Sequence, residues 1–409
     1  MFSFIYLYYG KKYSKDQCVF GPNSKAICKF CSRMYKERYE DFKKKRYSCR
    51  NIMKNKCTLL IDGNWLLQSR MAVIMEQFDK TKTKHELESS QVELIERMAR
   101  SIIIVLNKFK DIDNFILIQD GGSWRNQLQI PSQLGEKYKG NREHDIEIDW
   151  SYIFNSLNKL SEHCKDQNIT TSQLLNAEGD DWMWYWSRKL NSEGTNCIIW
   201  SSDNDLKQLV QVENGAFTAW YNDKHGLFFH NDLNDEQEVD VDFFLNTNYK
   251  SPLLESLQRN TQCSFINPDD IIMSKIICGD SGDNIKSVIK VEKNGRRYGI
   301  GNKDWETIRK NLHIDSFSSF LEHIDDIVIE LINLKKFSCY NLNKSLVREM
   351  IDYNIKLVWL NEQVIPEPVI QGMNNIEYQK CDIQYVRSNY KVLCGEREVE
   401  DIMSIFDSI

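Results

Sequence analysis

The sequence has no apolar run near twenty residues, which is the length that a membrane-spanning helix needs. Its first residues, MFSFIYLYYG, are apolar but lack the basic leader and the small-residue cleavage site of a signal peptide. Internal repeats and low-complexity segments are absent too. Because the 12 cysteines come without a secretion signal, we expect reduced thiols, a cytosolic location and no membrane partner.

The charge is distributed unevenly along the 409 residues, a length that can fill two or three compact units. Residues 1–57 contain 15 Lys and Arg against 4 Asp and Glu, a local net charge of +11. The whole chain carries −6, so the other 352 residues carry −17. Net charge does not exclude a basic track on one face, so nucleic acid stays among the expected partners.

The basic segment 1–57 holds five of the twelve cysteines, including the pair in CKFC at residues 28–31. A tetrahedral zinc module would use Cys18, Cys28, Cys31 and Cys49. A second CxxC is missing, so zinc ligands and free buried thiols stay equally weighted interpretations. The stretch SRMYKERYEDFKKKR predicts a basic helix, lying either on a phosphate backbone or in solvent.

Strand and helix patterns alternate from Thr58 onward. Apolar runs at residues 58–62, 114–119 and 197–200 predict buried strands, and residues 91–110 carry apolar residues at helical spacing. AFTAWYNDKHGLFFH predicts a hairpin, and a helix bears Trp182, Trp184 and Trp186, for which core packing is favoured over base stacking. The fold class is therefore α/β, with a mostly parallel sheet between helices.

Acidic residues follow the predicted strands and fill two further loops. They are Asp62, Asp120, Glu178, Asp180, Asp203, Asp205, Asp280 and Asp283. The carboxyl ends of parallel strands share one edge, where open α/β folds bind ligands. Taken alone, Asp203 and Asp205 are as compatible with a helix cap as with a metal site. Together the eight carboxylates would repel one another unless cations neutralise them, which favours two hard divalent ions and metal-activated water over a covalent nucleophile.

Six segments occur in the order seen in the structure-specific 5′ nucleases: LLIDGN, QDGGSWR, YKGNR, AEGDD, SSDNDLKQL and GDSGDNI. The chain resembles this family over about residues 58–370, and within it most resembles the ribonuclease H (5′-3′ exonuclease) of T-even phages. The resemblance implies a PIN-like sheet flanked by helices, a helix–three-turn–helix DNA-binding element and a helical C-terminal region. It divides the chain into an N-terminal extension (1–57), a catalytic domain (58–262) with an arch at about 125–165, and a C-terminal domain (263–409).

The resemblance also implies roles for particular residues. The ligands of a first metal ion would be Asp62, Asp120, Glu178, Asp180 and Asp203, and those of a second would be Asp205, Asp280 and Asp283. Asp181 is expected to start a helix instead. Cations assisting the reaction would be Arg125 and Lys137, and the DNA contacts would be Tyr138, Lys139, Arg142, Gly299, Gly301, Asn302 and Lys303. The implied cofactors are two Mg²⁺ ions, replaceable by Mn²⁺, and K⁺ in the DNA-binding turn, beside zinc in the extension.

The sequence departs from the family in three places. AEGDD has Gly179 where alanine is usual, KSVIKVEKNGRRY before GIG is longer than expected, and residues 1–57 lie outside the resemblance, with Met53 as an alternative start. We expect a monomeric Mg²⁺-dependent 5′-3′ exonuclease and flap endonuclease, acting on flapped or nicked DNA and RNA–DNA hybrids in replication, in the host cytoplasm if a phage encodes it. A sliding clamp or single-strand-binding protein would be its partners. The alternatives are a non-catalytic DNA-binding protein and a PIN-type RNA endonuclease.

Overall fold

A computed structural model describes residues 56–131, 138–140, 147–213, 216–233, 261–293 and 296–395. These residues belong to one compact unit, Asn51–Ile409. The lengths and ends of the elements follow from local sequence signals. The longest helix, α4 (Lys84–Lys108), begins at a capping box in which Thr83 and Glu86 satisfy each other's backbone N–H groups. Within the described residues, no helix is long and apolar enough to cross a membrane.

The central sheet has the strand order β3-β2-β1-β4-β6-β7-β8, and β5 also pairs with β6. The strands are β1 (Cys57–Asp62), β2 (Ile112–Ile118), β3 (Thr170–Ser172), β4 (Asn196–Trp200), β5 (Gln211–Glu213), β6 (Ala216–Asn222), β7 (Gly226–His230) and β8 (Cys263–Ile266). Strands β3, β2, β1, β4 and β6 run parallel, and β6 and β7 form the predicted hairpin. The predicted mostly parallel sheet is confirmed.

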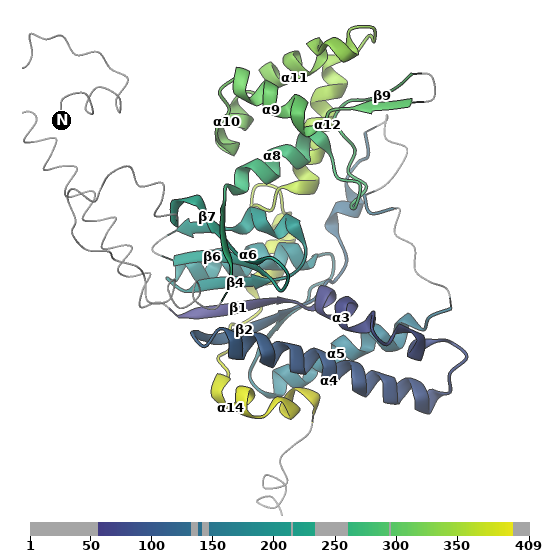
Figure 1. Cartoon of the computed structure of the whole chain (residues 1–409), viewed down its shortest axis with the longest axis vertical. Helices are drawn as coiled ribbons and strands as arrows, with labels where there is room; N and C mark the ends of the chain where they lie inside the picture. The colour runs from purple at the N-terminus through teal and green to yellow at the C-terminus, as the bar shows by residue number, and fades with distance from the viewer. Residues whose placement is uncertain are drawn as a thin grey trace, which may run out of the picture. The chain divides into compact units, whose positions relative to one another are not determined.

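Helices cover both faces of the sheet (Figure 1). Side chains alternate along a strand, so Leu59 and Ile61 of β1 enter one core while Leu60 enters the other. The first core is closed by α3 (Gly63–Met71), α4 and α5 (Trp150–Asp166), and the second by α6 (Gly179–Ser192). Trp182, Trp184 and Trp186 of α6 are buried, which confirms the core interpretation of these rings. Double coverage explains why the central strands β1 and β4 are buried and largely apolar.

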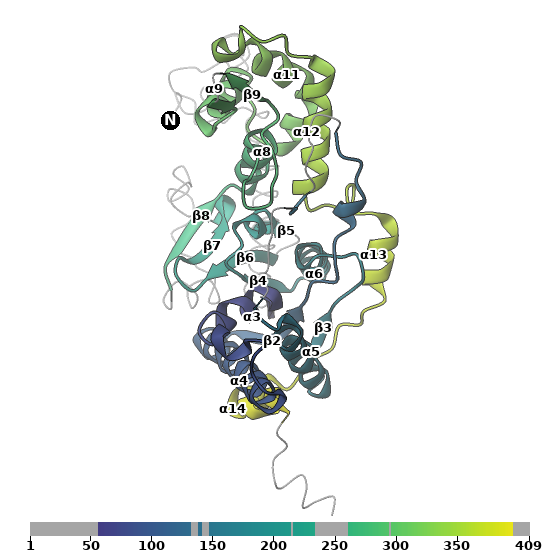
Figure 2. The ribbon, with the colours of Figure 1, turned by 90° about the vertical axis from the view of Figure 1, so that its right-hand side faces the viewer.

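A third core lies in a helical region built mainly from residues 268–358. Its helices are α8 (Pro268–Cys278), α9 (Asn302–Asn311), α10 (Phe317–Glu322), α11 (Ile324–Asn333) and α12 (Lys344–Val358). Between α8 and α9 the chain forms a separate ribbon of β9 (Lys290–Lys293) and β10 (Arg296–Gly299). Figure 2 shows this region beyond the β8 edge of the sheet. The expected helical C-terminal region is confirmed.

The expected division at residue 263 does not follow the packing. Strand β8 begins there and pairs with β7, so it belongs to the central sheet. After Leu360 the chain returns to the sheet through α13 (Glu367–Asn374), α14 (Ile383–Ser388) and η9 (Tyr390–Cys394). The Tyr378 hydroxyl lies 3.0 Å from that of Thr58, and Arg387 donates to the carbonyl of Ile112 at 2.9 Å. Strand pairing attaches the start of the 263–395 segment to the sheet. Core packing and these hydrogen bonds attach its end.

The expected arch range, about 125–165, also needs correction at its C-terminal end. Residues 150–165 lie in α5, whose Ile153, Leu157 and Leu160 are fully or almost fully buried in the first core. The remaining short elements are the 3-10 helices η2 (Met75–Phe78), η3 (Trp124–Gln127), η4 (Asn204–Leu209), η5 (Asn231–Leu233) and η8 (Lys335–Phe337). The segment after β4 was expected to enter a helix, and the structure gives the shorter η4.

Candidate metal centre

Three parallel strands bring their carboxyl ends to one edge of the sheet. Asp62 ends β1, Asp120 lies two residues beyond β2, and Asp203 lies three residues beyond β4. Asp62 caps α3 by accepting from the Trp65 amide (2.9 Å), and its other oxygen accepts from the Ser201 hydroxyl (2.7 Å). Asp203 accepts from the Asp205 amide at 2.8 Å. The capping interpretation, made for Asp203 and Asp205, therefore holds for Asp203, which caps η4. Asp62 and Asp203 also stand at the shared edge.

Two further carboxylates come from the start of α6. Glu178 is the N-cap of this helix and Asp180 lies in its first turn. The Gly179 amide donates to Asp120 at 2.6 Å, which joins the start of α6 to the loop after β2. A Cβ on Gly179 would come 3.0 Å from that same carboxylate oxygen, so glycine suits this close approach. We call Asp62, Asp120, Glu178, Asp180 and Asp203 the edge group.

The carboxylates of the edge group act on one another's pKa. Burial raises the pKa of Asp62 to about 6, and the charges of Asp120 and Asp203 add to this rise against hydrogen bonds from Ser201 and Trp65. Burial, followed by the charge of Asp203, raises the pKa of Asp180 well above its ordinary value. The four aspartates therefore share one electrostatic field, in which a bound cation would favour the ionised carboxylates.

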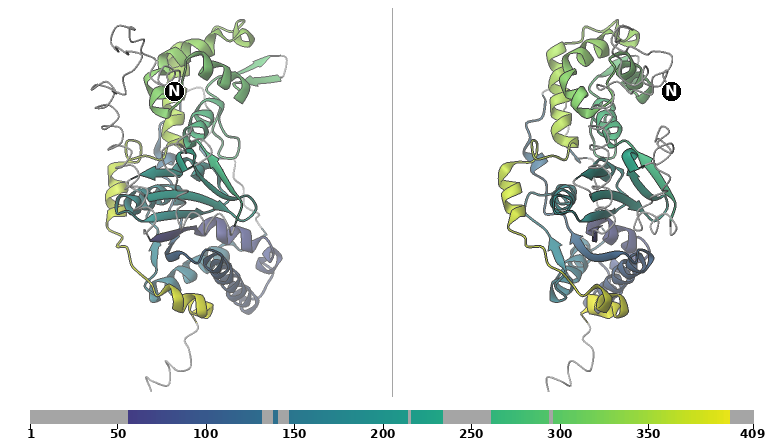
Figure 3. Two further views of the ribbon diagram at one scale, coloured as in Figure 1. Left: turned by 60° about the vertical axis from the view of Figure 1, so that its left-hand side comes forward. Right: turned by 90° about the vertical axis from the view of Figure 1, so that its left-hand side faces the viewer.

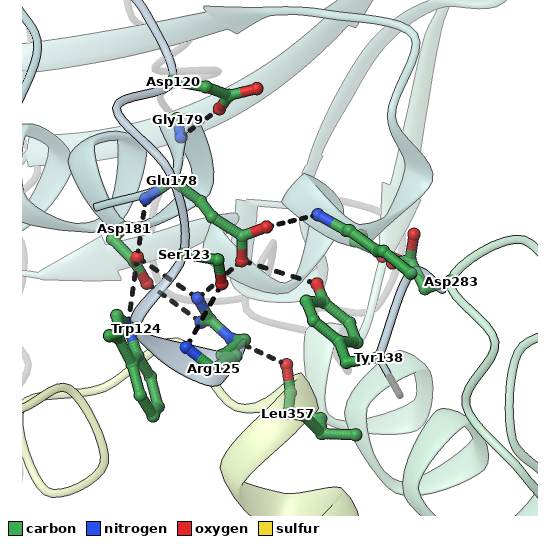
Figure 4. A network of polar contacts seen from close by, with 12 residues as sticks. Asp120, Ser123, Trp124, Arg125, Tyr138, Glu178, Gly179, Asp181, Asp283 and Leu357 are labelled. Atoms are coloured by element: carbon green, nitrogen blue, oxygen red, sulfur yellow. Dashed lines mark hydrogen bonds and ion pairs between the residues drawn. The ribbon is translucent and has the colours of Figure 1, made fainter. Parts of the chain in front are cut away.

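Glu178 is surrounded by cationic and hydroxyl donors (Figure 4). Arg125 donates to it at 2.8 Å, Lys139 at 2.5 Å and the Tyr138 hydroxyl at 3.4 Å. Although burial opposes ionisation, Lys139 and Arg125 hold the pKa of Glu178 below its ordinary value. Glu178 is therefore an ionised carboxylate fixed from two sides.

Arg125, expected to assist the reaction as a cation, is buried beside Glu178. It is 2% exposed and forms a second ion pair with Asp181 at 2.9 Å. Its Nε donates to the carbonyl of Leu357 in α12 at 3.1 Å. With these partners inside the protein, Arg125 holds Glu178 and joins the sheet edge to the helical region. Asp181 starts α6 as expected, because it accepts from the Glu178 amide at 3.0 Å.

A second set of carboxylates gathers where η4 meets the turn after α8. Oxygens of Asp205, Asp280 and Asp283 all lie within 4.8 Å of one another, and we call these residues the turn group. Gly279, at a φ of 80°, lets the chain leave α8, and the Gly282 amide then donates to Asp280 at 2.7 Å. Burial raises the pKa of Asp205 to about 6, with Lys275 opposing the rise and Asp203 adding to it. The turn group therefore adjoins the edge group through Asp203.

Lys275 of α8 lies among these three carboxylates and was not anticipated from the sequence. Its ammonium is 3.0 Å from Asp280 and 3.4 Å from Asp283, and it also pairs with Asp205. The residue is only 9% exposed, and although its burial opposes this, Asp205 and Asp283 raise its pKa. A sequence signal existed, since a lysine flanked by IIMS and IIC on a buried helix needs a charged partner.

The remaining predicted residues fall into three sets. Tyr138 is 8% exposed and packs in the third core, which leaves its ring no open face for stacking on a base. Gly299 ends β10, and Gly301, Asn302 and Lys303 are exposed around the start of α9. Lys137, Arg142, Cys18, Cys28, Cys31, Cys49 and Met53 lie outside the described residues, so their roles stay predictions.

Comparison with known proteins gives the site a family context. Residues 57–240 match the family described as 5′-3′ exonuclease, N-terminal resolvase-like domain. A 5′-3′ exonuclease of Mycoplasmopsis pulmonis (strain UAB CTIP) is 25% identical over 312 residues, which are 75% of this chain and 88% of that protein. The fold resembles that of the D15 protein of bacteriophage T5 co-crystallised with metal ions, with a TM-score of 0.50, 16% identity, and coverage of 83% of this chain and 99% of that one.

Proposed function

We propose that the chain is a 5′ nuclease of the 5′-3′ exonuclease family, and that it hydrolyses phosphodiesters at the 5′ ends and flaps of branched DNA and RNA–DNA hybrids with two Mg²⁺ ions. The observation that carries the two-ion proposal is the adjacency of the edge group and the turn group. Asp203 of the edge group accepts from the amide of Asp205 of the turn group at 2.8 Å, and its charge raises the pKa of both Asp180 and Asp205.

The donor set fits hard divalent cations. Both groups offer carboxylate oxygens, the ligands that Mg²⁺ and Mn²⁺ prefer. The turn group sets three carboxylates against the single ammonium of Lys275. The edge group would hold one ion and the turn group the other, which together would activate water and neutralise charge on the attacking and leaving oxygens.

The chain's own side chains would position this chemistry. Ser201 orients Asp62 by a 2.7 Å hydrogen bond, and Arg125 and Lys139 fix Glu178. Lys139 is the more exposed of these two cations and would approach a phosphate beside the edge group. Burial raises the pKa of the thiols of Cys57, Cys164 and Cys197, which argues against a thiolate nucleophile among them.

The helical region would supply the duplex contact. The exposed start of α9 would offer the backbone N–H groups of Asn302 and Lys303 to a phosphate, with K⁺ at the adjoining turn, while the Gly301 amide donates to Asp304 at 2.9 Å. Such contacts read the backbone and shape of the duplex, so binding would be independent of sequence and strongly salt-dependent. Removal of primers and flaps during replication, beside a clamp or a single-strand-binding protein, is the role that this activity would serve.

Cleavage of an end-labelled 5′ flap in Mg²⁺ tests the proposal. We expect cleavage that EDTA stops, that Mn²⁺ restores, and that Asp203→Asn abolishes. Asp166→Asn is the matched control, because Asp166 is exposed at the end of α5, away from the acidic edge. Cleavage that survives Asp203→Asn would overturn the site, and cleavage of single-stranded RNA without any action on DNA would favour the RNA endonuclease alternative.

A further inference from the structure

The ribbon β9–β10 is an addition at the point where the sequence between GDSGDNI and GIG is longer than expected. Its register pairs Lys290 with Gly299 and Lys293 with Arg296. In the described part of the chain, its two strands pair only with each other. Figure 3 shows the ribbon standing out from the helical region.

The base of the ribbon is fixed in the third core. Val288, Ile289 and Ile300 are buried there on either side of the two strands. The Ile300 amide donates to the Ser287 hydroxyl at 3.0 Å, and the Lys336 ammonium donates to the Gly299 carbonyl at 2.6 Å. These contacts set the direction in which the ribbon leaves the core.

Beyond that base the ribbon carries charge and exposed surface. Its strands contain Lys290, Lys293, Arg296 and Arg297 against Glu292, a net charge of +3. Lys290 is exposed, and Tyr298 is 41% exposed. A lone two-stranded ribbon is only marginally stable in water, so a projecting and basic one fits a polyanionic partner better than a structural role.

We propose that the β9–β10 ribbon is a second duplex-binding element that contacts phosphates next to those reached by α9. Chain continuity supports this assignment, because β10 ends at Gly299, two residues before the exposed N-cap Gly301 of α9. A two-stranded ribbon also fits the major groove of B-form DNA, which is about 12 Å wide. The inference rests on the proposed function, since it extends the duplex footprint of the same nuclease.

Fluorescence anisotropy of labelled DNA in EDTA tests the ribbon without turnover. The variant is the triple substitution Lys290→Ala, Lys293→Ala and Arg296→Ala. We expect duplex affinity to fall by roughly 10- to 100-fold at 150 mM salt, and the slope of log K against log salt to fall by about 3. Binding to single strands is expected to stay unchanged.

The matched control neutralises the same number of charges elsewhere. Lys110, Lys165 and Lys380 are exposed, and the triple change of these residues to alanine is expected to leave duplex binding unaltered. Circular dichroism and the Tm check that both triple variants fold. Unchanged duplex affinity and salt slope in the ribbon variant would overturn the inference, as would an equal loss for single strands or for the control. Failure of the proposed function would give a different result, in which the protein binds duplex DNA but shows no Mg²⁺-dependent cleavage.

Discussion

The edge group and the turn group differ in how their carboxylates are held. The edge group combines Asp62, Asp120 and Asp203, at or just beyond strand ends of one sheet, with Glu178 and Asp180 at the start of α6. Its oxygens accept from Ser201, Gly179, Arg125 and Lys139. The turn group combines Asp205, from the sheet, with Asp280 and Asp283, from the turn after α8, around the ammonium of Lys275. The edge group is therefore positioned by the sheet together with the start of α6, and the turn group by packing between the sheet and the helical region.

The packing that creates the turn group depends on a few buried polar contacts. Asn354 of α12 is fully buried and donates to the carbonyls of Ile276 at 2.7 Å and Lys286 at 2.9 Å, on either side of the acidic turn. Gln208 of η4 donates to the carbonyl of Val358 at 3.1 Å. We infer that the edge group is the more rigid of the two, and that the turn group is sensitive to changes in the helical region.

Substituting one carboxylate of each group tests this difference most strongly. We expect Asp62→Asn to lower the single-turnover rate of flap cleavage in Mg²⁺ by on the order of 10³-fold, because it removes charge from the centre of the edge group. Asp283→Asn is expected to cost about 10- to 100-fold, since Asp205, Asp280 and Lys275 stay in place. Equal losses, or a larger loss for Asp283→Asn, would contradict the distinction.

Comparing variants of Arg125 and Lys139 distinguishes a residue that supports the edge group from a residue that contacts the substrate. Arg125→Ala leaves Glu178 and Asp181 without a buried cation, so the free energy of unfolding in urea should fall by about 3–5 kcal/mol. Lys139→Ala leaves Glu178 paired with Arg125 and should cost less than about 1 kcal/mol while it slows cleavage. A stable Arg125→Ala variant that fails only in cleavage would show that Arg125 acts on the substrate instead.

Substitution of Lys275 tests how far its ammonium neutralises the three carboxylates of the turn group. Lys275→Met should lower the stability of the metal-free protein by about 1–3 kcal/mol, because three neighbouring carboxylates lose their shared cation. The same change should increase the rise in Tm on adding Mg²⁺, since the ion would no longer face a neighbouring ammonium. Lys310→Met, on the exposed side of α9, is the matched control. A smaller Mg²⁺ effect in Lys275→Met would show that the lysine assists ion binding.

The smallest expected effect concerns the hydroxyl that connects two edge-group residues. Ser201 is fully buried, donates to Asp62 and accepts from the Asp203 amide at 3.0 Å. Ser201→Ala should lower stability by about 1 kcal/mol and slow cleavage roughly tenfold through loss of orientation. Ser192→Ala, an exposed serine that bonds only its own helix, should change neither quantity. If Ser201→Ala cleaves at the normal rate, Asp62 does not need this support.

The sequence predicts the sheet and the positions of the acids because both depend on local pattern. The apolar runs that precede Asp62, Asp120 and Asp203 predict buried strands, and parallel strands place their carboxyl ends at one edge. The hairpin of β6 and β7 follows from its turn residues in the same way. Local sequence patterns were therefore sufficient to predict the central strands, their shared edge and the β6–β7 hairpin.

Contacts between distant segments could not be obtained in this manner. Strand β8 is four residues long and half-buried, so it lacks the apolar signature of a core strand. The return of the chain through α13 and α14 depends on contacts such as Asn114 with Gln379, made at 2.8 Å across 265 positions. The hydrogen bond from Arg125 Nε to the Leu357 carbonyl likewise depends on tertiary packing. Such contacts determine whether a cationic side chain is buried in an ion pair or exposed to the substrate.

Anomalous diffraction from a crystal soaked in Mn²⁺ would locate divalent ions independently of any cleavage assay. We expect the edge group and the turn group each to hold one ion, with Asp203 between them. We predict two anomalous peaks, one bounded by Asp62, Asp120, Glu178, Asp180 and Asp203, and one bounded by Asp205, Asp280 and Asp283. Peaks away from these carboxylates, or none at a saturating concentration of Mn²⁺, would contradict the account.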